Sequence, residues 1–332
     1  MAVRVAVDAM GGDDAPGVVV QGAVEALQKA EGALQVVLVG PEATVRAELG
    51  EHDTSGLALD VLDAPEVIAM AEPPAAAVKN KTRSSIHAGL GAHKQGDVDA
   101  FASAGNTGAV MAASLVLLGR LPGVLRPTLP GIFPTVEGFA IIVDVGANVD
   151  SKPEHLAQFA RMGQVYVERA FRRERPTVGL LNVGEEPSKG NEASKAAYAL
   201  LSELGGLHFV GNVEGRDVMH HAADVVVCDG FVGNIVLKLG ESLATALPQL
   251  IRAEVQRQGL GPEAVGAIRT VFGNVTRPFS YEEYGGTPLL GVTGTSVIGH
   301  GGSSAKAIAQ MIHRAAEIAR EDVHGAIAEA LA

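Results

Sequence analysis

Val98-Asp-Ala-Phe-Ala-Ser-Ala-Gly-Asn-Thr-Gly108 is the stretch of this sequence that decides the fold. An apolar strand, predicted at Val98–Ala102, leads into a loop of small and polar residues at Ser103–Gly108, and an apolar helical run follows. Strand, small-residue loop and helix are typical of βαβ units that build a parallel sheet. The same order recurs at Asp8–Pro16, Asp144–Pro153, Asn182–Gly190, Asp229–Asn234 and His300–Ser304. We therefore predict an α/β fold around a mostly parallel sheet.

The chemistry of these loops favours an anionic ligand. Carboxyl ends of parallel strands share one edge of a sheet, so we expect the loops to converge on a single crevice. Small residues let backbone N–H groups approach a ligand, and the start of each following helix carries a partial positive charge. Phosphate is the anion that such sites bind most readily.

Composition narrows the class of protein. The chain has 332 residues, 41 of them glycine, and no tryptophan, and no low-complexity linker divides it, so we expect one domain over residues 1–332. A net charge of −12 argues against nucleic-acid binding. The lone Cys228 allows no internal disulfide and suits a reducing cytoplasm. We expect no leader and no membrane span, because the longest apolar stretch, Val110–Leu118, is too short to cross a bilayer.

Several familiar signatures are absent. No GxGxxG follows a strand, and the nearest approach, at Gly299–Ser304, ends in serine where the last glycine belongs. No Walker A loop, HExxH or GxSxG occurs either. His220 and His221 are adjacent and point apart on a helix, so they are poor joint metal ligands. We therefore expect neither a cofactor nor a metal ion.

Secondary structure follows from apolar runs and their periodicity. Strands are predicted at Val3–Val7, Gln35–Val39, Ala58–Leu62, Val98–Ala102, Phe139–Val143, Val178–Leu181, His208–Val210, Val225–Cys228 and Leu289–Val292. A helical hairpin is predicted at about 241–272, because two apolar stripes flank the break Gly259-Leu-Gly-Pro262. We expect Pro248 to kink its first helix.

Eight loops, taken in order, resemble those of the bacterial phosphate acyltransferase family, the PlsX-type enzymes of phospholipid synthesis. They are Asp8–Pro16, Lys79–Ser85, Ser103–Gly108, Asp144–Pro153, Asn182–Gly190, Asn212–Asp217, Cys228–Lys238 and Gly299–Lys306. The resemblance extends from the first strand to the last long helix.

This resemblance implies an activity and an assembly. The reaction would convert fatty acyl-acyl carrier protein and inorganic phosphate to acyl phosphate and free carrier protein. The fold would be a three-layer α/β/α sandwich, isocitrate/isopropylmalate dehydrogenase-like or phosphotransacetylase-like, with a projecting helical hairpin. The implied protein is a cytoplasmic homodimer that attaches reversibly to the membrane surface, with a glycerol-3-phosphate acyltransferase as a possible downstream partner. The projecting hairpin would serve dimerisation and membrane contact.

Candidate site residues follow from the chemistry and from the resemblance. Phosphate and a thioester are both reactive enough to need no serine or cysteine nucleophile, so the enzyme must position phosphate and stabilise an oxyanion. The candidate catalytic residues are Lys189, Asn234 and His300; His300 either protonates the leaving thiolate or caps a helix. The candidate phosphate-binding residues are Asp8, Gly11, Gly12, Ser103, Gly105, Asn106, Thr107, Gly108, Asn148, Asn182, Gly184, Ser188, Gly233, Gly301, Ser303 and Ser304.

A basic cluster is the candidate docking patch for an acidic carrier protein. Arg172, Arg173 and Arg175 lie at the end of a helix predicted at Glu154–Arg173. These arginines could equally complement the dipole of that helix. Three other functions stay open: a phosphotransacetylase-like enzyme that uses acyl-coenzyme A, a decarboxylating dehydrogenase, and a membrane-docked protein that binds phosphate without turnover.

Overall fold

The computed structural model describes residues 2–332, and their strands form two sheets. The six-stranded sheet has the order β10-β11-β4-β1-β2-β3, with β10 antiparallel to β11 and the other pairs parallel. Its strands are β1 (Val3–Asp8), β2 (Leu34–Gly40), β3 (Leu59–Asp63), β4 (Ala100–Ser103), β10 (Thr287–Pro288) and β11 (Ser296–Ile298). The five-stranded sheet has the order β5-β6-β9-β7-β8, with β5 antiparallel to β6. Its strands are β5 (Pro130–Thr135), β6 (Gly138–Val143), β7 (Thr177–Asn182), β8 (His208–Glu214) and β9 (Val225–Val227).

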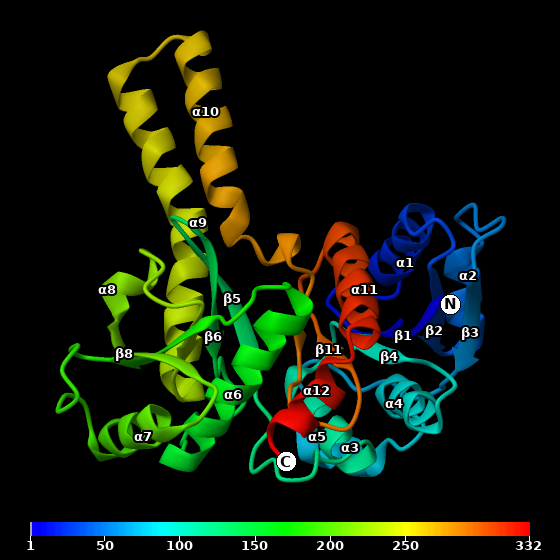
Figure 1. The fold of residues 1–332 in the computed structure, drawn as a ribbon. Helices are drawn as coiled ribbons and strands as arrows, with labels where there is room; N and C mark the ends of the chain where they lie inside the picture. The colour runs from blue at the N-terminus through cyan, green and yellow to red at the C-terminus, as the bar shows by residue number, and fades with distance from the viewer. Residues whose placement is uncertain (1) are drawn as a thin grey trace.

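Helices cover both faces of each sheet, which makes the fold a three-layer α/β/α sandwich (Figure 1). The longer helices are α1 (Gly17–Lys29), α4 (Ser85–Gln95), α5 (Thr107–Leu117), α6 (Pro153–Ala170), α7 (Glu192–Glu203), α9 (Gly230–Gln258), α10 (Pro262–Thr276) and α11 (Ala305–Arg320). The shorter ones are α2 (Glu42–Leu49), α3 (Pro74–Asn80), α8 (Gly215–Val218) and α12 (Val323–Ala330), with 3₁₀ turns η1 (Arg277–Phe279) and η2 (Tyr281–Glu283).

Alternation along the strands sends side chains into two cores, one on each face. On β1, Val5 and Val7 join the core that contains α1 and α11, whereas Ala6 joins the core that contains α4 and α5. On β6, Ile141 enters the first core and Ile142 the second. Each core therefore extends across both sheets.

The parallel strands of the two sheets run in opposite directions where the sheets meet. Thr128, just before β5, pairs antiparallel with Leu290, just after β10. Because β10 is also antiparallel to β11, and β5 to β6, strand β11 runs against β6. The expectation of a single crevice holds in part: loops that follow β4, β6, β9 and β11 contribute to one pocket, whereas the loop that follows β7 does not line it.

The predicted elements are largely confirmed, with three strands missed. All predicted strands up to Val225–Cys228 appear within a few residues of their predicted bounds. The prediction at Leu289–Val292 is wrong, because this segment forms only isolated bridges between the short strands β10 and β11. The strands that were missed are β10, β11 and β5. Strand β5 carries Pro130 and Pro134, which an edge strand tolerates because one of its sides has no partner.

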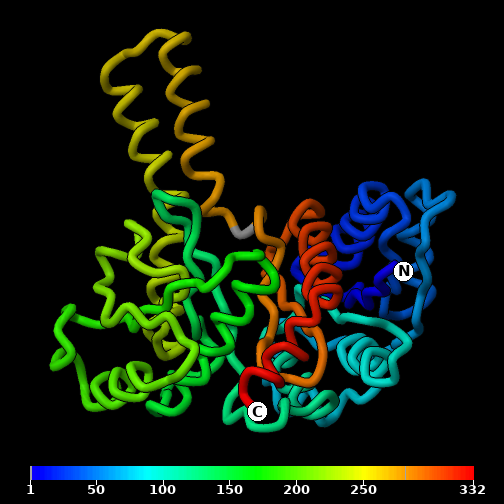
Figure 2. The backbone as a smooth tube through the Cα atoms, in the orientation of Figure 1, coloured from blue at the N-terminus to red at the C-terminus, as the bar shows by residue number. Residues whose placement is uncertain are grey.

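The helical hairpin projects away from both sheets, as the tube in Figure 2 shows. Its first helix, α9, is longer than predicted: it begins at Gly230 and continues through Pro248 to Gln258. Gly259 ends α9 in the left-handed region at φ 64°, and Pro262 opens α10.

Candidate active site

The first loop group comprises residues 8–16, 103–108 and 299–304, which follow β1, β4 and β11. Hydrogen bonds join its loops: the Asp13 N–H donates to the Gly301 carbonyl, and the Gly299 N–H to the Ser103 carbonyl, each over 2.8 Å. Gly11 marks a close approach, since a Cβ there would lie 2.7 Å from Asp8 Oδ2. The structure thus brings together Asp8, Gly11, Gly12, Ser103, Gly105, Asn106, Thr107, Gly108, Gly301, Ser303 and Ser304.

Asp8 lies beneath the first loop group and holds its backbone in place. Its carboxylate accepts a 2.7 Å hydrogen bond from Ser103 Oγ and a 3.1 Å bond from the Met10 N–H. Burial raises the pKa of Asp8, while hydrogen bonds from Ser85, Ser103 and Met10 act in the opposite direction. A negative carboxylate repels phosphate, so Asp8 is not a direct phosphate ligand. Because it accepts hydrogen bonds from Ser103 and Met10, its role is to position the loops around it.

Two helices begin in the first loop group and present backbone donors. Asn106 caps α5 by accepting from the Ala109 N–H over 3.1 Å, and its amide nitrogen donates to carbonyls of segment 69–72. These bonds occupy the Asn106 side chain. Within residues 2–332, the Thr107 and Gly108 N–H groups have no acceptor, as at the first turn of any helix.

The start of α11 is built in the same way. Ser304 caps it by accepting from the Ala307 N–H over 3.3 Å. Ser303 Oγ donates to the His300 carbonyl over 2.6 Å, which tightens the turn before the helix. Because β4 and β11 are parallel neighbours in the sheet, α5 and α11 start at the same edge of it, one on each face. Together they make one positive, donor-rich edge.

The second loop group, residues 144–148 and 229–234, lies at the carboxyl edge of the five-stranded sheet. The Asp144 carboxylate accepts from the Asn148 N–H at 2.6 Å and the Asn148 side chain at 2.9 Å, and burial raises its pKa against these bonds. Gly230 and Gly233 let α9 start against this loop, since a Cβ on Gly233 would lie 1.9 Å from the Asp144 carbonyl oxygen. Asn148 and Gly233 therefore position the loop.

The third loop group, residues 182–190 with Asn212, lies at the far side of the five-stranded sheet, after β7 and β8. Asn182 holds it by donating to Asn212 Oδ1 over 3.1 Å and to the Lys189 carbonyl over 3.2 Å. Lys189 Nζ lies 3.8 Å from Glu186 Oε1, and its side chain is 48% exposed. Gly184, Ser188 and Lys189 are thus brought together here, but apart from the first loop group.

A pocket of about 240 Å³ lies between the sheets and reaches both the first and second loop groups. That volume is far above the roughly 15 Å³ that a single water molecule needs. One wall is β5 with the beginning of α9, and the other contains residues 284–287 and 298–300. Phe133 and Phe279 close one part of it, with ring centroids 6.4 Å apart in an edge-to-face arrangement.

Four predicted site residues line this pocket: Thr107, Asn234, His300 and Ser303. His300 Nδ1 accepts from the Gly302 N–H over 3.3 Å, so in the neutral ring the proton is on Nε2. Of the three predicted catalytic residues, Asn234 and His300 reach the pocket, whereas Lys189 is not among its lining residues. The pocket thus combines an apolar wall with hydroxyl, amide and imidazole groups.

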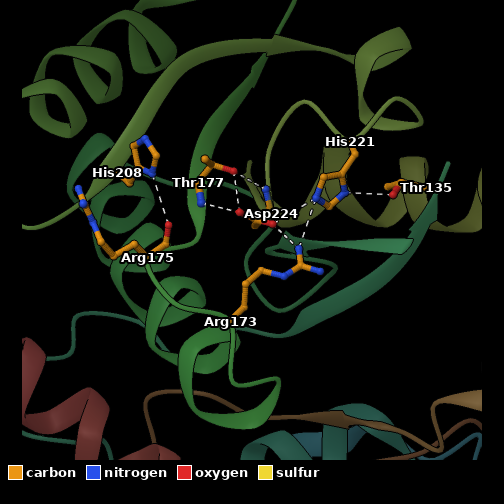
Figure 3. A network of polar contacts seen from close by, with 7 residues as sticks. All are labelled: Thr135, Arg173, Arg175, Thr177, His208, His221 and Asp224. Atoms are coloured by element: carbon orange, nitrogen blue, oxygen red, sulfur yellow. Dashed lines mark hydrogen bonds and ion pairs between the residues drawn. The ribbon is translucent and has the colours of Figure 1, made fainter. Parts of the chain in front are cut away.

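The predicted arginine patch lies outside the pocket lining, and two of its members have carboxylate partners. Arg172 pairs with Glu321 over 2.7 Å at the surface. Figure 3 shows Arg173 turned toward Asp224, with which it forms an ion pair. Asp224 also accepts hydrogen bonds from the Thr177 N–H and hydroxyl. Burial alone would raise the pKa of Asp224, but the bonds from Thr177 and the ion pair with Arg173 outweigh it, and the pKa is lowered. The network ties the starts of β7 and β9 together.

Cys228 is buried, as predicted, and burial raises the pKa of its thiol. Among residues 2–332, no cluster of three or more His, Cys, Asp or Glu side chains is arranged to hold a metal ion. In the same range, no helix combines the length and apolar character needed to span a bilayer.

Comparisons with known proteins agree with this architecture. The sequence model of the family described as "Fatty acid synthesis protein" matches residues 3–325. The phosphate acyltransferase of Salinibacter ruber is 53% identical over 330 residues, which cover 99% of this chain and 98% of its own. That of Chlorobaculum parvum is 47% identical over 337 residues, covering 99% of each chain. The chain belongs to the phosphate acyltransferase (PlsX) family. Members of the phosphate acyltransferase family are enzymes, and the chain is accordingly an acyltransferase.

Solved structures that this chain resembles in fold include two phosphotransacetylases. The enzyme from Streptococcus pyogenes superposes with a TM-score of 0.65 at 17% identity and covers 96% of this phosphate acyltransferase chain and 94% of its own. The EutD phosphotransacetylase of Staphylococcus aureus gives 0.62 at 16% identity, with the same coverage. At such identities the likeness extends to the fold, which is phosphotransacetylase-like as predicted.

Sequence reasoning missed the apolar part of this phosphate acyltransferase's pocket. Leu237, Phe133 and Phe279 come from α9, β5 and η1, and nothing in their local sequence distinguishes them from core residues. The role of Asp144 as a positioning residue could have been predicted from the sequence. Val143-Asp144 repeats the pattern of Val7-Asp8, in which an aspartate follows the last apolar residue of a strand.

Proposed function

We propose that the enzyme transfers a fatty acyl group from acyl carrier protein to inorganic phosphate, yielding acyl phosphate and free carrier protein for phospholipid synthesis. The observation that carries this proposal is the contact between a donor-rich edge, built from the starts of α5 and α11, and a pocket with an apolar wall. Such a combination suits one anionic reactant and one lipid-like reactant. Membership of the phosphate acyltransferase family supports it.

Phosphate binds, in this proposal, at the first loop group. The Thr107 and Gly108 N–H groups, the Thr107 hydroxyl and the start of α11 supply its donors. Asp8 and Asn106 hold these donors in position. In this proposal Asn148 and Gly233 position the second loop group. The third loop group, which includes Lys189, does not line the pocket and does not bind phosphate.

The reaction needs no residue nucleophile. A phosphate oxygen attacks the thioester carbonyl carbon, the carbonyl oxygen becomes an oxyanion, and the C–S bond then breaks to release a thiolate. Backbone N–H groups and Asn234 stabilise the oxyanion. His300, with its proton on Nε2, donates a hydrogen bond from Nε2–H to the leaving sulfur, and the released thiolate takes its proton from solvent. Holding both reactants in one site contributes several kcal/mol, up to roughly 7–11 in well-oriented systems.

An acidic carrier protein must approach a chain with a net charge of −12, so a local basic patch is required. Arg172, Arg173 and Arg175 form this patch in our proposal. Since Arg173 is engaged with Asp224, the charges available to a partner are chiefly those of Arg172 and Arg175.

The projecting hairpin serves, in this proposal, as dimer interface and membrane contact at the cytoplasmic face. Its helices enclose an apolar groove of about 590 Å³ lined by Ile251, Val255, Ile268 and Phe272, and no described residue of α10 is buried. Unburied apolar faces of this kind typically contact a partner or a lipid surface. Two hairpins pair across a two-fold axis, and Leu260 at the tip reaches lipid. A glycerol-3-phosphate acyltransferase on the same membrane then consumes the acyl phosphate.

The deciding experiment incubates the enzyme with phosphate and a long-chain thioester and traps acyl phosphate with hydroxylamine as hydroxamate. We expect faster turnover with acyl-acyl carrier protein than with the matching acyl-coenzyme A. The reverse order makes the enzyme a phosphotransacetylase-like acyl-coenzyme A:phosphate acyltransferase. Absence of hydroxamate with both donors refutes the proposed reaction.

A further inference from the structure

We propose that the acyl chain of the substrate lies along the wall formed by β5 and α9, and that Leu237 limits the chain length the enzyme accepts. This inference rests on the proposed function, because it names where one of the two reactants binds. It assigns a specificity-determining residue.

The middle of the wall is apolar and lies beside the reactive groups. Leu129, Ile132 and Phe133 from β5 and its approach, and Leu237 from α9, line the same pocket as His300 and Thr107. A saturated chain gains about 0.8 kcal/mol for each methylene removed from water, and this wall can provide that burial. The pocket's charged lining residues Lys238 and Glu241 pair with each other over 2.8 Å, which leaves the apolar wall uncharged.

Leu237 lies midway along this wall. Asn234 and Glu241 mark its ends on α9, and the seven steps along the helix from one to the other span about 10 Å at 1.5 Å per residue. A chain that enters from either end must therefore pass Leu237 to occupy the full length. Shorter chains end before it.

Two glycines set the width of the pocket around Leu237. A Cβ on Gly131 of β5 would lie 3.1 Å from Leu237 Cδ2 and 2.9 Å from Val145 Cγ1. One turn further along α9, a Cβ on Gly240 would lie 2.5 Å from the Phe133 ring. Strand and helix are thus already in contact here, and there is no slack to absorb a larger side chain at Leu237. Any added volume goes into the pocket.

The test replaces Leu237 by phenylalanine and by alanine and measures kcat/KM for acyl donors of increasing length, with hydroxamate as product. Excluding a methylene costs about fourfold, which is 0.8 kcal/mol at tenfold per 1.4 kcal/mol, so excluding two lowers the long-to-short ratio more than tenfold in Leu237→Phe. Leu237→Ala raises the ratio. Leu239→Phe is the matched control, because Leu239 is on the same helix, 60% exposed and not among the pocket's lining residues.

A second readout separates this inference from the proposed reaction. Displacement of a fluorescent long-chain fatty acid by unlabelled fatty acids reports binding without turnover. If wild type makes no hydroxamate but Leu237→Phe alone loses the long-chain probe, the reaction is wrong and the acyl pocket stands. If Leu237→Phe and Leu239→Phe give the same length profile and the same probe binding, the acyl pocket is refuted.

Discussion

Replacing Ser103 by alanine tests whether Asp8 holds the first loop group as a buried, charged carboxylate. Ser103 is fully buried at the end of β4, and its hydroxyl donates to Asp8 Oδ2 over 2.7 Å while accepting from the Gly105 N–H over 3.0 Å. The substitution removes both bonds and leaves a carboxylate and an N–H group with fewer partners.

The expected loss follows from those two bonds. A hydrogen bond to a charged group contributes roughly 1.5–3 kcal/mol, and an unpaired buried N–H costs about 1 kcal/mol or more. We therefore expect Ser103→Ala to lower the free energy of unfolding by about 2.5–4 kcal/mol near neutral pH. The phosphate KM rises as well, because Gly105 precedes the donors at the start of α5.

The matched control is Ser114→Ala, which removes an equally buried serine that shares a 3.0 Å bond with Ser296 Oγ, a neutral partner. We expect a loss of about 1–2 kcal/mol that does not vary with pH. Urea midpoints, converted with the measured slopes, give both values.

The pH dependence of the stability loss in Ser103→Ala shows whether Asp8 is charged. Because the pKa of Asp8 in the folded protein is raised above its ordinary value of 3.8, its contribution to stability decreases as the pH rises from 3.8 through the folded pKa. Ser103→Ala removes a donor that favours the charged form, so the loss of stability is larger at a pH above the folded pKa of Asp8 than at a pH below it. A loss that is equal at both values, or no larger than that of Ser114→Ala, refutes a charged, Ser103-anchored Asp8.

Further predictions concern the residues around the pocket and the hairpin. Lys189→Ala should leave the phosphate KM of the folded enzyme nearly unchanged, because Lys189 is not among the pocket's lining residues; a large increase in steady-state KM assigns it to phosphate after all. Arg173→Glu should lower the urea midpoint as well as carrier-protein use, because it places a second carboxylate beside Asp224, and unchanged stability contradicts the ion pair. Leu260→Glu should reduce liposome co-sedimentation but keep the dimer, whereas Ile268→Glu should weaken the dimer in analytical ultracentrifugation; the opposite pattern reverses the two assignments.

The sequence by itself determined the α/β class and most elements. Local signals were sufficient there, because buried parallel strands such as Val3–Asp8 are short apolar runs, and the loops after them need glycine and polar caps at fixed positions. The break that defines the hairpin was equally local, since Gly259 and Pro262 restrict the backbone wherever they occur. Ser103, Thr107 and Gly301 were found as neighbours because β4 and β11 are both parallel strands of one sheet.

Only the tertiary structure decided how the loops are distributed. The antiparallel bridge between Thr128 and Leu290 reverses the chain direction between the two sheets, and loops with similar sequences are divided between those sheets. Strand order separates Lys189 from His300, because β7 and β8 are the strands of the five-stranded sheet that lie farthest from β5. The pocket wall was beyond the sequence for the same reason: Leu237 and Gly131 lie over a hundred residues apart, and their contact depends on how β5 and α9 pack. Strand order and packing are long-range properties, and they fix which side chains meet.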